Sequence, residues 1–157
     1  MNSFDELRGV VSRLRAEDGC PWDREQTHQS LKAACIEEAS EVICGINVLE
    51  KTGNAENLKE ELGDLLLQVV MHAQIAEEEG FFSLDDVIRG ITEKMIRRHP
   101  HVFGDISVRE SDEVLVNWEK IKEREKKNKE DVSVFLKEAF DESKELIDTA
   151  RKRKGYQ

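Results

Sequence analysis

Hydrophobic residues recur every three or four positions along most of the chain, and this spacing predicts helices. The first predicted helix starts at Ser3, which has capping-box spacing with Glu6, and ends near Gly19. Its apolar stripe consists of Phe4, Leu7, Val10, Val11 and Leu14. After it, Pro21 predicts a loop, and we expect Trp22 to pack that loop onto the rest of the molecule.

Two long helices follow, from about 28 to 51, capped by Thr27, and from about 55 to 79. The short segment around Gly53 is a helix-stop signal, so the two helices must pack antiparallel. The centre of the second, residues 65 to 71, is apolar on nearly all sides. Such a helix is buried on more than one side, and we therefore expect a second subunit to complete the bundle.

The second half of the chain is also predicted to be helical. Ser83 caps a helix that Pro100 ends, and a loop covers residues 99 to 110. Ser111 caps another helix to about 127, and residues 131 to 153 form the last. No strand-like alternation is evident. The predicted fold is all-α, an antiparallel helical bundle whose four-helix core is completed in a homodimer or higher homo-oligomer.

Length and charge narrow the class of protein. A chain of 157 residues predicts one compact domain with a real core. Its net charge of −10 argues against nucleic acid and anionic membranes as main partners. The three cysteines have no C-x-x-C spacing, and no signal peptide or long apolar run appears. We therefore expect a soluble, cytoplasmic protein.

Two carboxylate pairs flank the turn between the long helices. Glu38 and Glu41 precede Gly53, and Glu61 and Asp64 follow it, each pair with i, i+3 spacing on one helix face. At 1.5 Å per residue, all four carboxylates fall within roughly 10 Å along the bundle axis. A solvated acidic face is the simpler explanation for one such pair. Two such pairs at the same height on facing helices, in apolar surroundings, indicate a bound cation instead. Ligands that are all oxygen favour Mg²⁺, Mn²⁺ or Ca²⁺.

Several motifs in order resemble one known family, the MazG nucleoside triphosphate pyrophosphohydrolases of the all-α superfamily. They are the two carboxylate pairs, Gly19-Cys20-Pro21-Trp22-Asp23, Glu61-Leu62-Gly63-Asp64-Leu65-Leu66 and Arg97-Arg98-His99-Pro100-His101-Val102-Phe103. The resemblance covers about residues 3 to 125. It implies a MazG-like domain over residues 1–128 and a helical extension over 129–157, which packs on the domain or on a partner subunit.

The resemblance also implies an activity and a site. The reaction would be hydrolysis of nucleoside or deoxynucleoside triphosphates to the monophosphate and pyrophosphate, as nucleotide-pool house-cleaning. Glu38, Glu41, Glu61 and Asp64 would be the catalytic metal ligands for Mg²⁺, with Mn²⁺ as a substitute. The substrate-binding residues would be Lys94, Arg98, Trp118 and Lys122. From spacing alone, Lys94 and Arg98 equally fit a cation pair at a helix C-terminus, Lys122 a solvated cation and Trp118 a core residue.

Two other functions compete with this prediction. A di-iron carboxylate bundle needs Glu-x-x-His on two helices, and the chain offers only Glu25 and His28 at that spacing. A non-catalytic MazG-like helical interaction module would keep the fold without the reaction. The basic run 151–154 is interpreted as a helix end that interacts with the helix dipole. No motif encodes the preference for base or sugar.

Overall fold

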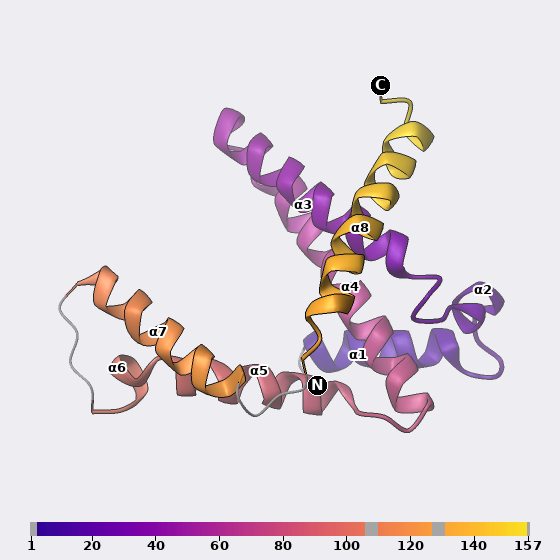
Figure 1. Cartoon of the computed structure of the whole chain (residues 1–157). Helices are drawn as coiled ribbons and strands as arrows, with labels where there is room; N and C mark the ends of the chain where they lie inside the picture. The colour runs from indigo at the N-terminus through magenta and orange to yellow at the C-terminus, as the bar shows by residue number, and fades with distance from the viewer. Residues whose placement is uncertain (1–2, 106–109, 127–130, 157) are drawn as a thin grey trace. The chain divides into compact units, whose positions relative to one another are not determined.

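The computed structural model describes residues 3–105, 110–126 and 131–156, and in those ranges the chain forms helices without a strand (Figure 1). The predicted all-α fold is therefore confirmed. In chain order the helices are α1 (Ser3–Arg15), α2 (Pro21–Glu25), α3 (Lys32–Thr52), α4 (Glu56–Glu78), α5 (Leu84–Arg98), α6 (Pro100–Phe103), α7 (Ser111–Lys126) and α8 (Ser133–Arg153). Within the described residues, none of these helices combines the length and apolar character needed to cross a membrane.

The helices fall into two compact units. Residues 1–84 and 137–157 form the first, and residues 85–136 form the second. Most of α8 thus belongs to the same unit as α3 and α4. The domain boundary expected near residue 128 stays a prediction.

The first unit is built on the hairpin of α3 and α4. Gly53 ends α3 in the left-handed conformation, with φ of 72°, and its N–H donates to the carbonyl of Leu49 at 2.9 Å. The Asn54 side chain then accepts the N–H of Glu56 at 2.9 Å, which starts α4. Near the turn end of the hairpin, Gly45 is buried, and a Cβ there would lie 2.7 Å from the Cα of Leu58. The hairpin predicted from the Gly53 signal is present, and its helices touch almost backbone to backbone.

Arg15 joins the first helix to this hairpin. Its guanidinium binds the Glu78 carboxylate at 2.7 Å and donates to the carbonyls of Asp23 at 2.6 Å and Gln26 at 3.0 Å. Its side chain is only 7% exposed, so the charge is held by partners on α4 and beside α2. The small core of the unit consists of Val11, Leu31, Val70, Met71, Ala73, Ile75, Ala76 and Leu84.

Three local predictions were wrong. The α3 helix begins at Lys32 and not near residue 28. Thr27 and Ser30 exchange capping-box hydrogen bonds, but the turn that they cap ends at Leu31, because the N–H of Lys32 donates to the Gln29 carbonyl and interrupts the α-helical pattern. Pro21 opens the short helix α2 instead of a loop, since proline suits a first helical position. Trp22 on that helix is 64% exposed, so it does not pack on the described chain.

The expected loop 99–110 also contains a short helix, α6, which again starts at a proline. Part of that loop, residues 106–109, lies outside the described residues.

A pair of stacked histidines fastens the turn before α3 to α4. The rings of His28 and His72 are parallel within 1°, with centroids 5.0 Å apart, and their Nδ1 atoms are 2.7 Å apart. The other ring nitrogen of His72 lies 3.2 Å from the Cys35 thiol. Burial, and then the neighbouring His28, lower the pKa of His72 below its ordinary value of 6.5.

An apolar stripe on the hairpin stays exposed in the single chain. Leu62, Leu66 and Val69 on α4 are 50%, 38% and 43% exposed, and Ile43 and Ile46 on α3 are exposed as well. Their i, i+4, i+7 spacing makes the α4 residues one surface. A surface of this kind is typical of a subunit interface.

We therefore predict that the protein is a dimer or larger homo-oligomer and that Leu66→Glu dissociates it, because a charge would be buried at the contact. Sedimentation at micromolar concentration tests this. Val10→Glu is the matched control, since Val10 is also exposed but lies on α1. A wild-type protein that sediments as a folded monomer would contradict the prediction.

Candidate metal centre

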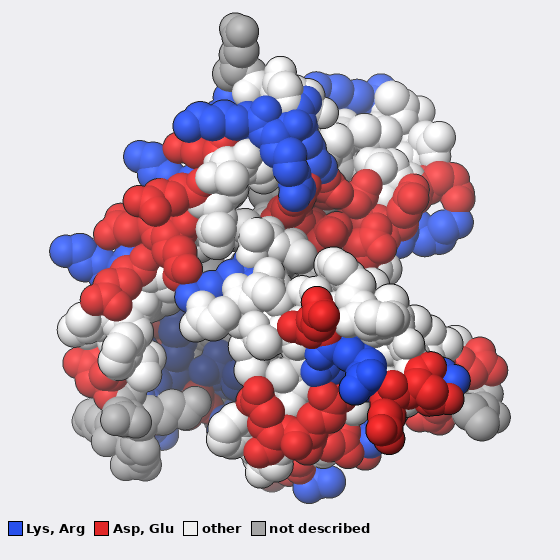
Figure 2. Space-filling view, turned by 90° about the vertical axis from the view of Figure 1, so that its right-hand side faces the viewer, with Lys and Arg blue, Asp and Glu red and all other residues white. Residues whose placement is uncertain are grey.

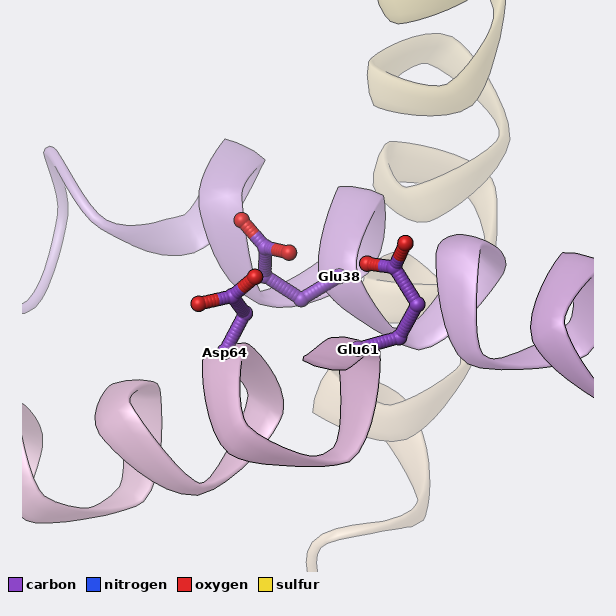
Figure 3. Close-up of side chains that lie close together, drawn as sticks. All are labelled: Glu38, Glu61 and Asp64. Atoms are coloured by element: carbon purple, nitrogen blue, oxygen red, sulfur yellow. The ribbon is translucent and has the colours of Figure 1, made fainter. Parts of the chain in front are cut away.

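The carboxylates predicted to bind metal come from facing helices of the hairpin. Glu38 lies on α3, and Glu61 and Asp64 lie one turn apart on α4. One carboxylate oxygen of each residue lies within 4.8 Å of those of the other two. Figure 3 shows the three side chains pointing toward one another. All three residues are half-buried. The structure therefore gathers three of the four predicted ligands.

The proximity of the three carboxylates is unfavourable when all are ionised. Burial raises the pKa of Glu38, and the charges of Asp64, Glu37 and Glu61 raise it further. One oxygen of Glu61 accepts a hydrogen bond from the Asn57 amide at 2.7 Å, which fixes that side chain. A cation bound among the three oxygens would remove the repulsion. The donor set is oxygen only, which suits Mg²⁺ or Mn²⁺ better than zinc.

Glu41, the fourth predicted ligand, is engaged elsewhere. Its carboxylate forms an ion pair with Lys154, just beyond the end of α8. Lys154 also lies 3.0 Å from the Glu37 carboxylate, which pairs with Arg153 as well. These contacts were not predicted from the sequence. The basic run 151–154 was visible, but its partners are more than 100 residues away in the chain.

The four predicted substrate-binding residues lie in the second unit. Lys94 and Arg98 are on α5, and Trp118 and Lys122 are on α7. The guanidinium carbon of Arg98 lies 5.3 Å from the centroid of the Trp118 ring, a cation–π arrangement. The ring of His99 meets the same indole edge-on at 4.9 Å. Lys94 is half-buried, and Lys122 pairs with Glu119 at 3.2 Å.

Glu125 on α7 organises the cations of this unit, and sequence reasoning missed it. Its carboxylate oxygens accept hydrogen bonds from the guanidinium nitrogens of Arg98 at 2.6 Å and Arg97 at 2.7 Å. Hydrogen bonds from Arg98 and then Arg97 lower the pKa of Glu125 from 4.5 to about 2. Arg98 is thus held between a carboxylate and an indole, and it joins α5 to α7.

The fold and the cluster together define a class of protein: an all-helical protein with a carboxylate cluster on a helical hairpin. Comparison with known sequences identifies the family. Residues 26–103 match the MazG nucleotide pyrophosphohydrolase domain. This chain belongs to the MazG family, as the motifs had indicated.

Curated relatives cover more of the chain than that domain. The MazG nucleoside triphosphate pyrophosphohydrolase/pyrophosphatase of Thermotoga maritima is 53% identical over 126 residues, which are 80% of this chain and 46% of that protein. The nucleoside triphosphate pyrophosphohydrolase of Escherichia coli is 46% identical over 130 residues, 82% of this chain and 48% of that protein. The uncharacterized protein YabN of Bacillus subtilis is 51% identical over 129 residues, 82% of this chain and 26% of that protein. The chain spans half the length of these relatives or less.

A solved structure shares the fold. The crystal structure of a MazG-related protein from Thermotoga maritima superposes with a TM-score of 0.60 at 26% sequence identity. The match covers 76% of this chain and 98% of that one.

The low pKa of Glu125 leads to a prediction about pH. A carboxyl whose pKa is lowered on folding stabilises the folded unit above pH 4.5, and that stabilisation is lost as the pH falls toward 2. We expect Trp118 fluorescence to change in this range, measured in a Trp22→Phe background so that one tryptophan emits. Helix content by circular dichroism, recorded in parallel, separates this local change from unfolding of the chain.

Glu125→Gln in the same background is the control for the pH titration. It removes the titrating group, so the fluorescence transition should disappear. A transition that persists in Glu125→Gln would mean that another group reports on Trp118.

Proposed function

We propose that this chain hydrolyses nucleoside triphosphates to the monophosphate and pyrophosphate with the help of a divalent cation. The observation that carries the proposal is the cluster of Glu38, Glu61 and Asp64 on the α3–α4 hairpin. The printed names of the Thermotoga maritima and Escherichia coli relatives describe this activity for those proteins. Their identity of 46% or more over most of this chain supports the same reaction here.

Glu38, Glu61 and Asp64 would hold Mg²⁺, and Mn²⁺ could replace it because it accepts the same oxygen donors. Glu41 is proposed as a fourth ligand, one helical turn from Glu38. The bound cation supplies Lewis-acid polarisation of a phosphoryl oxygen and lowers the pKa of water. The carboxylates hold that charge at one point of the hairpin, and the Asn57 amide orients Glu61 for the purpose.

We further propose that Lys94, Arg98 and Lys122 contact phosphate oxygens and that Trp118 contacts the nucleoside. Arg98 already lies against the Trp118 ring, so a phosphate and an aromatic contact are available side by side. Glu125 would then be a positioning residue, since it fixes the Arg98 guanidinium at 2.6 Å. Lys122 would have to leave Glu119 to reach a phosphate.

The biological role proposed for this activity is removal of unwanted nucleotides from the pool, by a cytoplasmic homo-oligomer. A panel of canonical, deoxy and modified nucleoside triphosphates, assayed for pyrophosphate release with Mg²⁺, tests both the reaction and the base preference. Release of orthophosphate instead of pyrophosphate would contradict the proposed bond cleavage. No release from any substrate would favour the non-catalytic interaction module.

Asp64→Asn tests the metal centre because it should lower activity without lowering the stability of the metal-free protein. The change removes one ligand charge, so we expect Mg²⁺-dependent hydrolysis to fall by about 100-fold or more. It also removes repulsion toward Glu38, so the metal-free variant should unfold at the same temperature as the wild type or higher. The stabilisation gained from Mg²⁺ should shrink. Thermal unfolding with and without Mg²⁺ measures the last two effects.

Glu60→Gln is the matched control for Asp64→Asn. It removes one charge from an exposed position of α4 next to Glu61. Its activity and its Mg²⁺ response should equal those of the wild type. An active Asp64→Asn enzyme, or one destabilised without metal, would argue against a metal ligand at this position.

Lys94→Ala tests the proposed phosphate contacts. We expect KM to rise about tenfold, the loss of roughly 1.4 kcal/mol from one charge-assisted hydrogen bond, while helix content stays unchanged. Lys94 is preferred to Arg98 for this test, because removal of Arg98 would also disturb Glu125. Lys120→Ala, an exposed cation on α7, should leave KM unchanged. Equal kinetics for Lys94→Ala and wild type would identify Lys94 as an ordinary surface cation.

A further inference from the structure

The end of α8 is fixed by its own backbone. Gly155 adopts the left-handed conformation with φ of 75°, and its N–H donates to the carbonyl of Lys152 at 3.1 Å. The N–H of Tyr156 donates to the carbonyl of Arg151 at 2.9 Å. These two bonds are a Schellman motif, which terminates a helix at a defined residue. Lys154 therefore leaves the helix at a fixed point.

Ion pairs at two levels attach α8 and the residue after it to α3. Lys32, the first residue of α3, holds both oxygens of Glu142 at 3.0 Å. Farther along both helices, Lys154 pairs with Glu37 at 3.0 Å and with Glu41. The last turns of α8 and the α3–α4 hairpin together line an open pocket of about 350 Å³, whose wall includes Glu41 and Glu61. The basic end of α8 thus borders the carboxylate cluster.

The charges at this border are complementary. Figure 2 shows basic side chains near the C-terminal end of the chain lying against acidic ones. Burial alone would raise the pKa of Glu37, but hydrogen bonds from Lys154 and Arg153 outweigh it and lower the pKa. Lys154 also counteracts the repulsion at Glu38 through space. Its ammonium therefore supplies part of the positive charge that the cluster needs.

The ion pair with Lys154 determines the position of the Glu41 carboxylate. It lies one turn after Glu38 on α3 and would share the cluster by spacing alone, yet it faces Lys154. The Lys154 and Glu41 side chains are 37% and 30% exposed, so water screens the pair and a divalent cation can compete for it.

We propose that Lys154 is a positioning residue of the metal centre: it holds Glu41 away from Glu38, Glu61 and Asp64 and competes with the divalent cation for that carboxylate. This inference rests on the proposed function, since it takes the three-carboxylate cluster as the metal site. The affinity of the centre for metal is then set by a helix outside the matched domain of residues 26–103. Release of Lys154 would accompany cation binding and free one positive charge beside the pocket.

The test measures Mn²⁺ binding without nucleotide, from the electron paramagnetic resonance signal of free Mn²⁺. Lys154→Met and Lys154→Gln remove the charge and keep much of the side chain. Each should bind Mn²⁺ about three- to tenfold more tightly than the wild type, the range expected for loss of a partly screened competing ion pair. Lys154→Arg keeps the charge and should bind Mn²⁺ like the wild type.

Two controls separate competition for Glu41 from a general change in charge. Lys152→Met removes a positive charge from an exposed position two residues away, and it should change the Mn²⁺ affinity less than twofold. In a Glu41→Gln background, Lys154→Met should also have less than a twofold effect, because the contested carboxylate is gone. Equal tightening in Lys152→Met, or full tightening in the Glu41→Gln background, would overturn the proposal.

Reciprocity provides a second measurement. If Lys154 lowers metal affinity, the metal must weaken the attachment of Lys154 by the same factor. Saturating Mg²⁺ should therefore speed amide hydrogen exchange at residues 150–156 of the wild type. Slower or unchanged exchange, unchanged or weaker Mn²⁺ binding in the Lys154 variants, or no Mn²⁺ binding by any variant would each overturn the inference.

The outcome is independent of catalysis, because no nucleotide is present. A protein that releases no pyrophosphate but shows the expected Mn²⁺ pattern would refute the proposed reaction and retain the role of Lys154.

Discussion

The carboxylate cluster depends on how closely two helices approach each other. Glu38 lies on the same hairpin as Glu61 and Asp64, and α3 and α4 approach closely at Gly45, where a Cβ would lie 2.7 Å from the Cα of Leu58. Any larger residue at Gly45 must push α4 away and widen the space between the carboxylates. The spacing of the three carboxylates therefore depends on packing two turns away from Glu38 and not on charge alone.

Repulsion between the carboxylates opposes this close packing of α3 and α4. Burial and then the neighbouring carboxylates raise the pKa of Glu38, so the hairpin folds against a local repulsion. In the first unit the cations of α8 offset part of that repulsion from the side. The second unit has the reverse arrangement, since the single carboxylate of Glu125 holds two guanidinium groups. The carboxylate cluster of the first unit and the Arg97–Arg98 pair of the second therefore each have a local excess of one sign, which a ligand of the opposite sign can neutralise.

The features that could be predicted from the sequence are those determined by residues close together in the chain. The Gly53 stop and the i, i+3 spacing of Glu61 and Asp64 predicted the hairpin and three of the gathered carboxylates. The contacts of Glu125 and Lys154 could not be predicted, because their partners come from helices far along the chain. The start of α3 was mistaken for a different reason. Thr27 is a good cap by residue type and does cap a turn through its bonds with Ser30, but that turn ends before α3 begins.

The stacked histidines have a consequence for the proton balance of folding. Their two Nδ1 atoms are 2.7 Å apart, and only one hydrogen can lie between them. The folded chain therefore excludes a second proton, in line with the lowered pKa of His72. Just below pH 6.5 the unfolded chain holds that proton more readily, so folding there must release it to the solvent. Formation of the turn that leads into α3 therefore releases a proton, and a mildly acidic pH disfavours it.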